Sequence, residues 1–150
     1  MYLTCAFSGH RNLKSYDFDP ALLDRVILNL IKNGTQNFLC GMALGFDMAA
    51  AESVMQFKKQ YNVKLTAVLP CKNQSDGYSE SNRARYRRIL ESCDEVVTLS
   101  EEYYTGCMHA RDRYMVENSQ ALICFLRKSG GGTYYTVNYA KKLNIPLIEL

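Results

Sequence analysis

The sequence predicts an α/β protein with a Rossmann-like, doubly wound fold, in which a mainly parallel sheet carries helices on both faces. Short apolar runs alternate with amphipathic helical segments along the whole chain, and this order favours parallel strands joined by right-handed crossovers. Three of the apolar runs end in glycine-containing turns, as strands do where they lead into a helix. With 150 residues the chain is long enough for one domain, and we expect a single domain over residues 1–150.

The first half of the chain carries three expected strands and two expected helices. The first strand ends at the turn of residues 8–11, where the apolar run gives way to a glycine and polar side chains. Asp19 followed by Pro20 is typical of an N-cap and a first helical position, and an apolar stripe at helical spacing continues to residues 33–34. The second strand ends in a GxxxG turn, residues 41–45, and the alanine-rich segment after it is a helix that can pack closely on the sheet. The expected strands are residues 2–7, 38–40 and 63–69, and the expected helices are residues 20–33 and 47–61.

The second half continues the alternation after the longest loop, residues 71–81, which follows Pro70 and has no periodicity. Ser81 and Asn82 are N-cap residue types, and the helix after them carries the densest basic cluster of the chain. That cluster is either a solvated face or a surface that steers an anionic ligand, and its members are Arg83, Arg85, Arg87 and Arg88. The expected strands are residues 95–99, 121–126 and 146–149, and the expected helices are residues 82–92, 108–118 and 133–143.

The composition is that of an average globular protein, with 47% hydrophobic and 22% charged residues. No apolar run approaches the ~18 residues of a membrane span, and no signal-peptide pattern opens the chain, so we expect a cytoplasmic protein without a membrane partner. A net charge of +3 is modest, which disfavours nucleic acid as the partner without excluding it. The six cysteines form no CxxC pair, and Cys107 with His109 cannot complete a tetrahedral site, so we expect neither a metal nor a cofactor.

The glycine turns are the chemically informative stretches. Residues 41–45 lack the GxGxxG dinucleotide pattern and nothing matches a P-loop, but a strand, a bare-backbone turn and a helix N-terminus together suit a phosphate or another anion. Residues 130–133, three glycines and a threonine, offer the same combination of free N–H groups with a hydroxyl. Either turn can instead serve only to reverse the chain and let a helix pack closely. Because the carboxyl ends of parallel strands share one edge of a sheet, we expect the three glycine turns to meet in one pocket.

Several polar residues near these turns have both a functional and a structural interpretation. Arg111 suits a bidentate contact to a phosphate or carboxylate, whereas Arg113 is explained by an ion pair with Glu117 one helical turn away. Asp47 either caps its helix or contacts a ribose hydroxyl or base. The candidate ligand-binding residues are Ser8, Gly9, His10, Arg11, Gly41, Met42, Ala43, Gly45, Asp47, Arg111, Gly130, Gly131, Gly132 and Thr133. No catalytic residue is assigned.

Taken together, the segments at residues 8–11, 41–47, 111–116 and 131–133 resemble the SLOG superfamily of Rossmann-like domains, and within it a small bacterial and phage family. The resemblance spans nearly the whole chain and implies a nucleotide or a nucleotide-derived ligand. The superfamily includes the LOG phosphoribohydrolases, whose PGGxGTxxE motif supplies a catalytic glutamate, and the DNA-processing protein DprA. Here Gly132 and Thr133 match the GT of that motif, but the position of the glutamate is Thr136, which is no carboxylate.

Three functions therefore stand as hypotheses. The first is binding or sensing of a nucleotide-like small molecule, with phosphate and ribose held by the glycine turns. The second is a LOG-like N-glycosidic hydrolase or nucleoside-transfer enzyme in which Asp47, Asp112 or Glu117 replaces the missing glutamate. The third is binding of a single-stranded nucleic acid on the same face. A homo-oligomer is compatible with all three.

Overall fold

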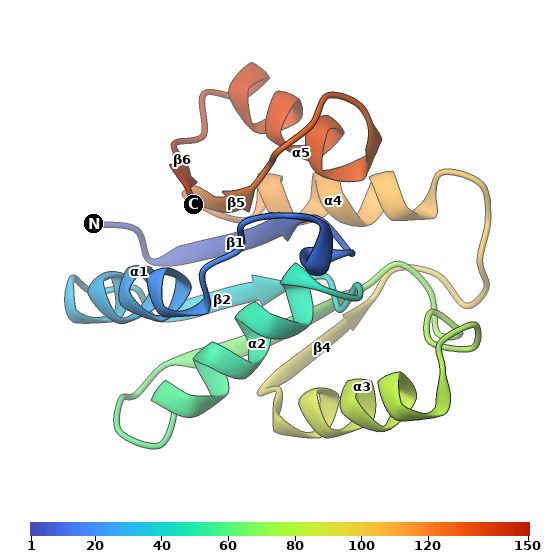
Figure 1. Cartoon of the computed structure of the whole chain (residues 1–150), viewed down its shortest axis with the longest axis horizontal. Helices are drawn as coiled ribbons and strands as arrows, with labels where there is room; N and C mark the ends of the chain where they lie inside the picture. Colours follow the sequence, from blue (N-terminus) through green and yellow to red (C-terminus); the bar gives the residue numbers. More distant parts are fainter.

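A six-stranded sheet in the order β4-β3-β2-β1-β5-β6 forms the centre of the molecule, and every neighbouring pair is parallel (Figure 1). The computed structural model describes residues 1–150. The strands are β1 (Thr4–Gly9), β2 (Asn37–Cys40), β3 (Lys64–Leu69), β4 (Glu95–Thr98), β5 (Ala121–Phe125) and β6 (Leu147–Glu149). The helices are α1 (Pro20–Lys32), α2 (Phe46–Phe57), α3 (Glu80–Ser92), α4 (Cys107–Glu117) and α5 (Gly131–Lys142), with a 3₁₀ turn η1 (Leu13–Ser15) after β1. The predicted Rossmann-like α/β class is confirmed.

The strand order reverses beside β1. Strands β2, β3 and β4 succeed one another on one side of β1, whereas β5 lies on its other side and pairs Gly9 with Phe125. In doubly wound sheets the crevice for ligands opens beyond the carboxyl ends of the strands at such a reversal. The topology therefore places the turns after β1 and β5 around one crevice.

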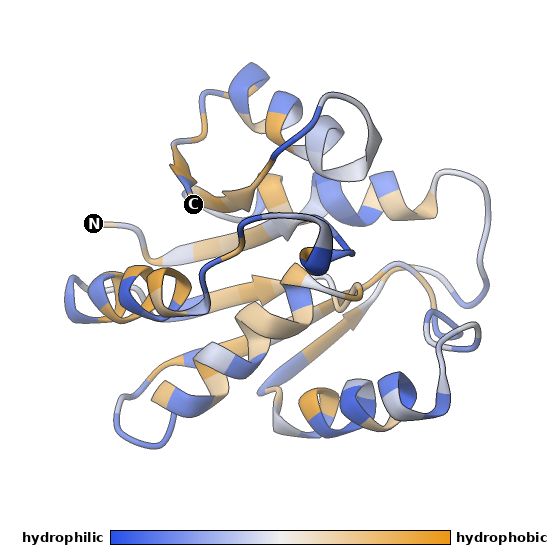
Figure 2. Ribbon diagram, viewed as in Figure 1, coloured by the Kyte–Doolittle hydropathy of each residue, from blue (hydrophilic) through white to orange (hydrophobic).

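Two apolar layers cover the two faces of the sheet. The larger one joins β1, β2 and β3 to α1, α2 and α3, and its largest buried side chains include Phe7, Phe38, Phe46 and Phe125. The smaller one packs α4 and α5 on the opposite face. In Figure 2 the strands are largely apolar, whereas the helices carry both apolar and hydrophilic residues. Three buried cysteines belong to these layers, Cys5 and Cys40 to the larger one and Cys124 to the smaller one.

Phe46, the first residue of α2, fixes the helix to the end of the sheet. Its ring stacks on Phe125 at 6.0 Å between centroids and meets Phe7 edge to face at 6.3 Å. Gly9 lies so close beneath it that a Cβ there would be 2.3 Å from Phe46 Cγ. Glycine at position 9 is therefore required for the close approach of α2 to β1.

Several element boundaries differ from the sequence predictions. Helix α3 begins at Glu80 with Ser79 as its N-cap, whose side chain accepts from the N–H of Asn82, so Ser81 and Asn82 lie in the first turn and do not cap the helix. Strand β1 extends to Gly9, because the ladder with β5 continues through residues 8 and 9. Helix α2 ends at Phe57 rather than at residue 61, and the chain turns from there into β3. Helix α5 begins at Gly131, so its N-cap is Gly130 and Thr133 lies in the first turn instead of capping it. None of the helices combines the length and the apolar character that a membrane crossing requires.

Candidate ligand-binding site

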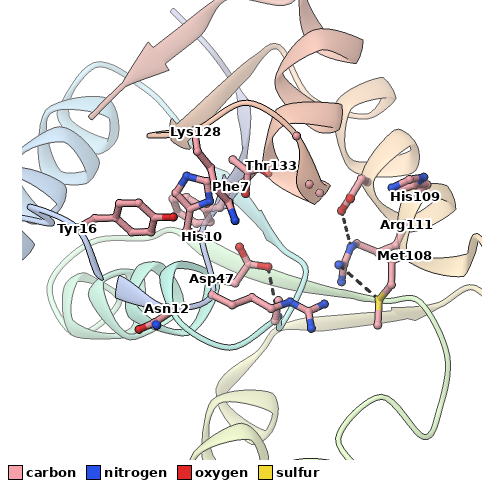
Figure 3. A pocket seen from close by; sticks show the side chains of 18 residues that line it. Phe7, His10, Asn12, Tyr16, Asp47, Met108, His109, Arg111, Lys128 and Thr133 are labelled. Atoms are coloured by element: carbon pink, nitrogen blue, oxygen red, sulfur yellow. Dashed lines mark hydrogen bonds and ion pairs between the residues drawn. The ribbon is translucent and has the colours of Figure 1, made fainter. Parts of the chain in front are cut away.

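A cavity of about 460 Å³ opens where the strand order reverses, beyond the ends of β1 and β5 (Figure 3). Four segments line it: residues 7–12 and 16 from β1 and the loop after it, residues 43 and 47 before and in α2, residues 108, 109, 111 and 112 of α4, and residues 128 and 130–133 leading into α5. Eleven predicted site residues meet there, namely Ser8, Gly9, His10, Arg11, Ala43, Asp47, Arg111, Gly130, Gly131, Gly132 and Thr133. The three glycine turns therefore lie around one crevice, although the second contributes only Ala43 and Asp47.

Four side-chain atoms in the wall are left for a ligand or water. Every fully buried side-chain nitrogen or oxygen of the protein has a hydrogen-bond partner. Ser8 Oγ, His10 Nδ1, Asp47 Oδ1 and Thr133 Oγ1 have no protein partner, so each must be accessible, although their residues are all less than a tenth exposed. They supply hydroxyl groups, an imidazole nitrogen and a carboxylate oxygen at the surface of the cavity.

The first turn of α5 supplies backbone donors. The N–H groups of Gly131, Gly132 and Thr133 have no acceptor within the helix, and they donate to no other backbone or side-chain group. These residues line the cavity, and the positive end of the helix dipole lies with them. Lys128, exposed just before this turn, adds a full positive charge.

His10 is held with a defined proton arrangement. Its Nε2 accepts a hydrogen bond of 2.8 Å from the backbone N–H of Arg127, and its ring stacks on Tyr16 with 4.7 Å between centroids. Burial, helped by the charges of Lys128 and Arg127, lowers the pKa of His10. A neutral imidazole that accepts at Nε2 carries its proton on Nδ1, so His10 offers a donor to the cavity.

Asp47 is the buried carboxylate of the site. Its Oδ2 accepts a hydrogen bond of 3.2 Å from the N–H of Ala43, so the carboxylate holds the turn before α2 rather than capping the helix, whose N-cap is Gly45. Burial raises the pKa of Asp47 to about 6 from 3.8, although the nearby Arg111 guanidinium opposes this rise. A carboxyl group that titrates near neutral pH can either accept from a ligand hydroxyl or exchange a proton with the ligand.

The pKa of Asp47 predicts a specific pH dependence of stability. The folded protein holds the proton more tightly than the unfolded chain does, so the contribution of Asp47 is fully present below about pH 4 and is lost as the pH rises through 6. The free energy of unfolding of the wild-type protein should therefore fall by about 3 kcal/mol as the pH rises, and that of the Asp47→Asn variant should not. Urea unfolding of the wild type and the variant from pH 4 to pH 8 gives one curve of unfolding free energy against pH for each protein, and the difference between the two curves measures the contribution of Asp47. Curves that run parallel over the whole range would contradict the buried, titrating carboxyl group.

Arg111 is a buried organiser of the site. Only 4% of the residue is exposed. Its guanidinium donates to Asp112 Oδ1 at 2.7 Å and to the carbonyl oxygen of Gly41, and it lies against Met108 Sδ at 3.8 Å. The sequence prediction of a free arginine fork is therefore only partly met, because at least two of its donors are already engaged by the protein.

Three predicted ligand contacts, Gly41, Met42 and Gly45, do not line the cavity. The carbonyl oxygen of Gly41 accepts from Arg111 and from Gln74, and a Cβ at Gly41 would lie 2.7 Å from Arg111 Nη1. Met42 is fully buried in the larger apolar layer. Gly45 lies against the backbone of Arg11. The turn therefore brings Arg111, Asp47 and the β1 loop together and presents little of its own backbone to a ligand.

Seven lining residues were not among the predicted contacts, namely Phe7, Asn12, Tyr16, Met108, His109, Asp112 and Lys128. Asn12 directly follows the predicted turn of residues 8–11, and Lys128 lies two residues before the turn of residues 130–133, so both are close to predicted turns in the sequence. Tyr16 and His109 reach the cavity through the course of a loop and the packing of α4, which no local pattern indicates. Thr136, at the position of the LOG glutamate, is buried and donates to the carbonyl oxygen of Gly132 at 2.8 Å.

The fold is similar to that of two solved proteins. DNA processing protein A from Helicobacter pylori superposes with a TM-score of 0.73 at 22% identity, and the match covers 97% of this chain and 63% of that one. DprA from Streptococcus pneumoniae superposes with a TM-score of 0.68 at 18% identity, over 97% of this chain and 52% of that one. The chain thus spans little more than half the length of these proteins, and the likeness concerns the fold.

Sequence comparison defines the family. The uncharacterized SPbeta prophage-derived protein YoqJ of Bacillus subtilis is 32% identical over 143 residues, which cover 87% of this chain and 82% of YoqJ. A UPF0398 protein of Halalkalibacterium halodurans is 32% identical over 136 residues, covering 87% of this chain and 71% of that protein. The model of the YspA SLOG family matches residues 13–145. The chain therefore belongs to the YspA SLOG family.

Proposed function

We propose that the protein binds a nucleotide or a nucleotide-derived ligand in the cavity between the ends of β1 and β5. The observation that carries this proposal is the set of free N–H groups of residues 131–133, since these residues line a 460 Å³ cavity together with Lys128. Free amides at a helix N-terminus together with a cation favour a phosphate. The volume lies within the range usual for small-molecule sites, and membership in a SLOG family supports the same ligand class.

The remaining groups suit the rest of a nucleotide. Asp47 Oδ1 is an acceptor for a ribose hydroxyl, and His10 Nδ1 is a donor for a phosphate or ribose oxygen. Arg11, which is exposed and lines the cavity, adds a second positive charge to that of Lys128. The free amides belong to the α5 side of the cavity and Asp47 to the α2 side, so the ligand would bind with its phosphate against α5 and its ribose toward α2.

A panel of nucleoside monophosphates, diphosphates and ADP-ribose tests the proposal. We expect a saturable rise in melting temperature with at least one of them, because a ligand that binds only the folded state stabilises it by mass action. Lys128→Ala should weaken binding about tenfold, which is the scale of one charge-assisted contact. Arg87→Ala is the matched control, because Arg87 is exposed on α3 away from the cavity. The absence of any shift across the panel would count against the proposal.

Single-stranded nucleic acid is a second candidate for the same face. The Helicobacter pylori protein of similar fold is described by its single-stranded DNA binding mode. Here Tyr134 is 37% exposed beside Gly130 and Gly131, so a stacking side chain adjoins the proposed phosphate site. A labelled oligothymidylate of about 20 nucleotides should then bind with an affinity that falls steeply with salt, and Lys128→Ala should make that slope shallower by about one. Binding that is absent, or that does not change with salt, would exclude this candidate.

Asp47 favours one form of the enzymatic alternative. It is the buried carboxyl group of the cavity, its pKa is raised to about 6, and it lies among the groups proposed to hold the ribose. It could therefore act as the acid or base in cleavage of an N-glycosidic bond. Release of free base from a nucleoside monophosphate, abolished in Asp47→Asn, would establish this activity. Stable binding without release would leave the protein a binding module.

A further inference from the structure

Three aromatic rings form a stack between α4 and α5, and one end of the stack borders the cavity. The rings of His109 and Tyr135 lie 3.9 Å apart at 11°, and those of Tyr135 and Tyr139 lie 6.4 Å apart at 7°. The stack is held in place at its polar ends. Arg113 Nη1 donates to the hydroxyl of Tyr135 at 2.8 Å, and the hydroxyl of Tyr139 donates to Glu117.

The end of this stack borders the cavity. His109 lines the cavity, whereas Tyr135 and Tyr139 do not. Tyr135 stacks on one face of the imidazole, no second ring stacks on the other face, and His109 is exposed and lines the cavity, so the face away from Tyr135 is the one left for a ligand. Figure 3 shows His109 on α4, on the opposite side of Thr133 from His10 and Tyr16.

We infer that the open face of His109 is the surface on which the base of the bound nucleotide stacks. This inference rests on the proposed function and assigns to the ligand a planar, aromatic part in addition to its phosphate. Offset stacking on a ring that is already fixed by its neighbours has a low entropic cost, because the side chain is ordered before the ligand arrives. A phosphate at the first turn of α5 and a base on His109 would occupy neighbouring parts of one crevice.

The other aromatic pair of the cavity is less suited to this role. His10 is only 7% exposed, one face of its ring is against Tyr16, and the ring makes an edge-to-face contact with Phe125 at 5.9 Å between centroids. Its nitrogens remain available for a polar contact, but little ring surface is free. Tyr16 is half-buried in the same cluster and also packs against Phe125.

Paired titrations with AMP and ribose 5-phosphate test the inference. Wild-type protein should bind AMP more tightly than ribose 5-phosphate. His109→Ala should weaken AMP about tenfold and leave ribose 5-phosphate unchanged, since stacking on an aromatic side chain is worth about this much per base. His109→Phe should restore the affinity for AMP, because it keeps the ring. Tyr103→Ala is the matched control, since Tyr103 is 60% exposed and does not line the cavity.

A fluorescence measurement gives an independent readout. The chain contains no tryptophan, so His109→Trp introduces a single reporter at the proposed platform. AMP should quench its emission saturably and ribose 5-phosphate should not, whereas a Tyr103→Trp reporter should respond to neither. Three results would overturn the assignment of the base to His109 while leaving nucleotide binding intact. His109→Ala could weaken the binding of AMP and ribose 5-phosphate equally, or weaken neither. Alternatively, AMP binding could be weakened only by Tyr16→Ala. Failure of the wild-type protein to bind either probe would overturn the inference and remove its basis in the proposed function.

Discussion

Replacing Gly45 with alanine is expected to destabilise the protein by about 3 kcal/mol or more. Gly45 is the N-cap of α2 and has φ 79° and ψ −116°, a conformation that residues with a side chain rarely adopt. A Cβ at this position would lie 2.1 Å from the carbonyl oxygen of Arg11, which is a backbone atom and cannot rotate away. The substitution therefore combines backbone strain with a collision that only movement of the β1–α1 loop can relieve.

Two other glycines serve as controls for this prediction. Gly130→Ala tests strain alone, because Gly130 has φ 82° but no atom within 4 Å of the added Cβ. Gly77→Ala tests neither strain nor collision and should stay within about 0.5 kcal/mol of wild type. In urea unfolding, the Gly45 variant should lose the most unfolding free energy, the Gly130 variant less, and the Gly77 variant least. If the Gly45 variant is at least as stable as the Gly130 variant, the close packing of Gly45 against the β1–α1 loop is contradicted.

Replacing Arg111 with alanine is expected to cost about 3–5 kcal/mol, the range for removing one partner from a buried ionic cluster. The guanidinium holds the carbonyl oxygen of Gly41 and pairs with Asp112, and it lowers the pKa of Asp47. Without it, both carboxylates lose their neighbouring positive charge, and the pKa of Asp47 should rise further. Because Asp47 can then be protonated at little cost, the destabilisation should be greatest at neutral pH and should shrink as the pH falls toward 4.

Unfolding free energies of Arg111→Ala and wild type at pH 4 and pH 7 measure this effect. Arg113→Ala is the matched control, since Arg113 lies on the same helix and binds Tyr135 outside the cavity. Arg111→Lys should fall between wild type and alanine, because lysine keeps the charge but loses the planar fork. If Arg111→Ala lowers the unfolding free energy only slightly, or by the same amount at pH 4 and pH 7, the role of Arg111 as the counter-charge of Asp47 is contradicted.

The alternation of apolar runs and amphipathic segments was sufficient to predict the sheet and its helices, because each element has its own periodicity. The same reasoning placed Asp47 and Arg111 at the site but missed the burial of Arg111, which depends on how α4 approaches Gly41. The sequence also predicts Gly41 and Gly45 as ligand contacts, because a glycine turn has the same local sequence whether its backbone contacts a ligand or another loop. No local pattern indicates the position of His109 at the cavity, because its stacking on Tyr135 joins two helices that are distant in sequence.

Amide chemical shifts during a titration with AMP test the central proposal most directly. In a ¹⁵N-labelled sample, the N–H signals of Gly131, Gly132 and Thr133 should move in a saturable manner, because these free donors are proposed to bind the phosphate. Inorganic phosphate should move the same signals at higher concentration. The N–H signals of α3 should remain in place. Saturable shifts confined to other parts of the chain, or no shift of the three amides with any nucleotide, would contradict a phosphate site at the start of α5.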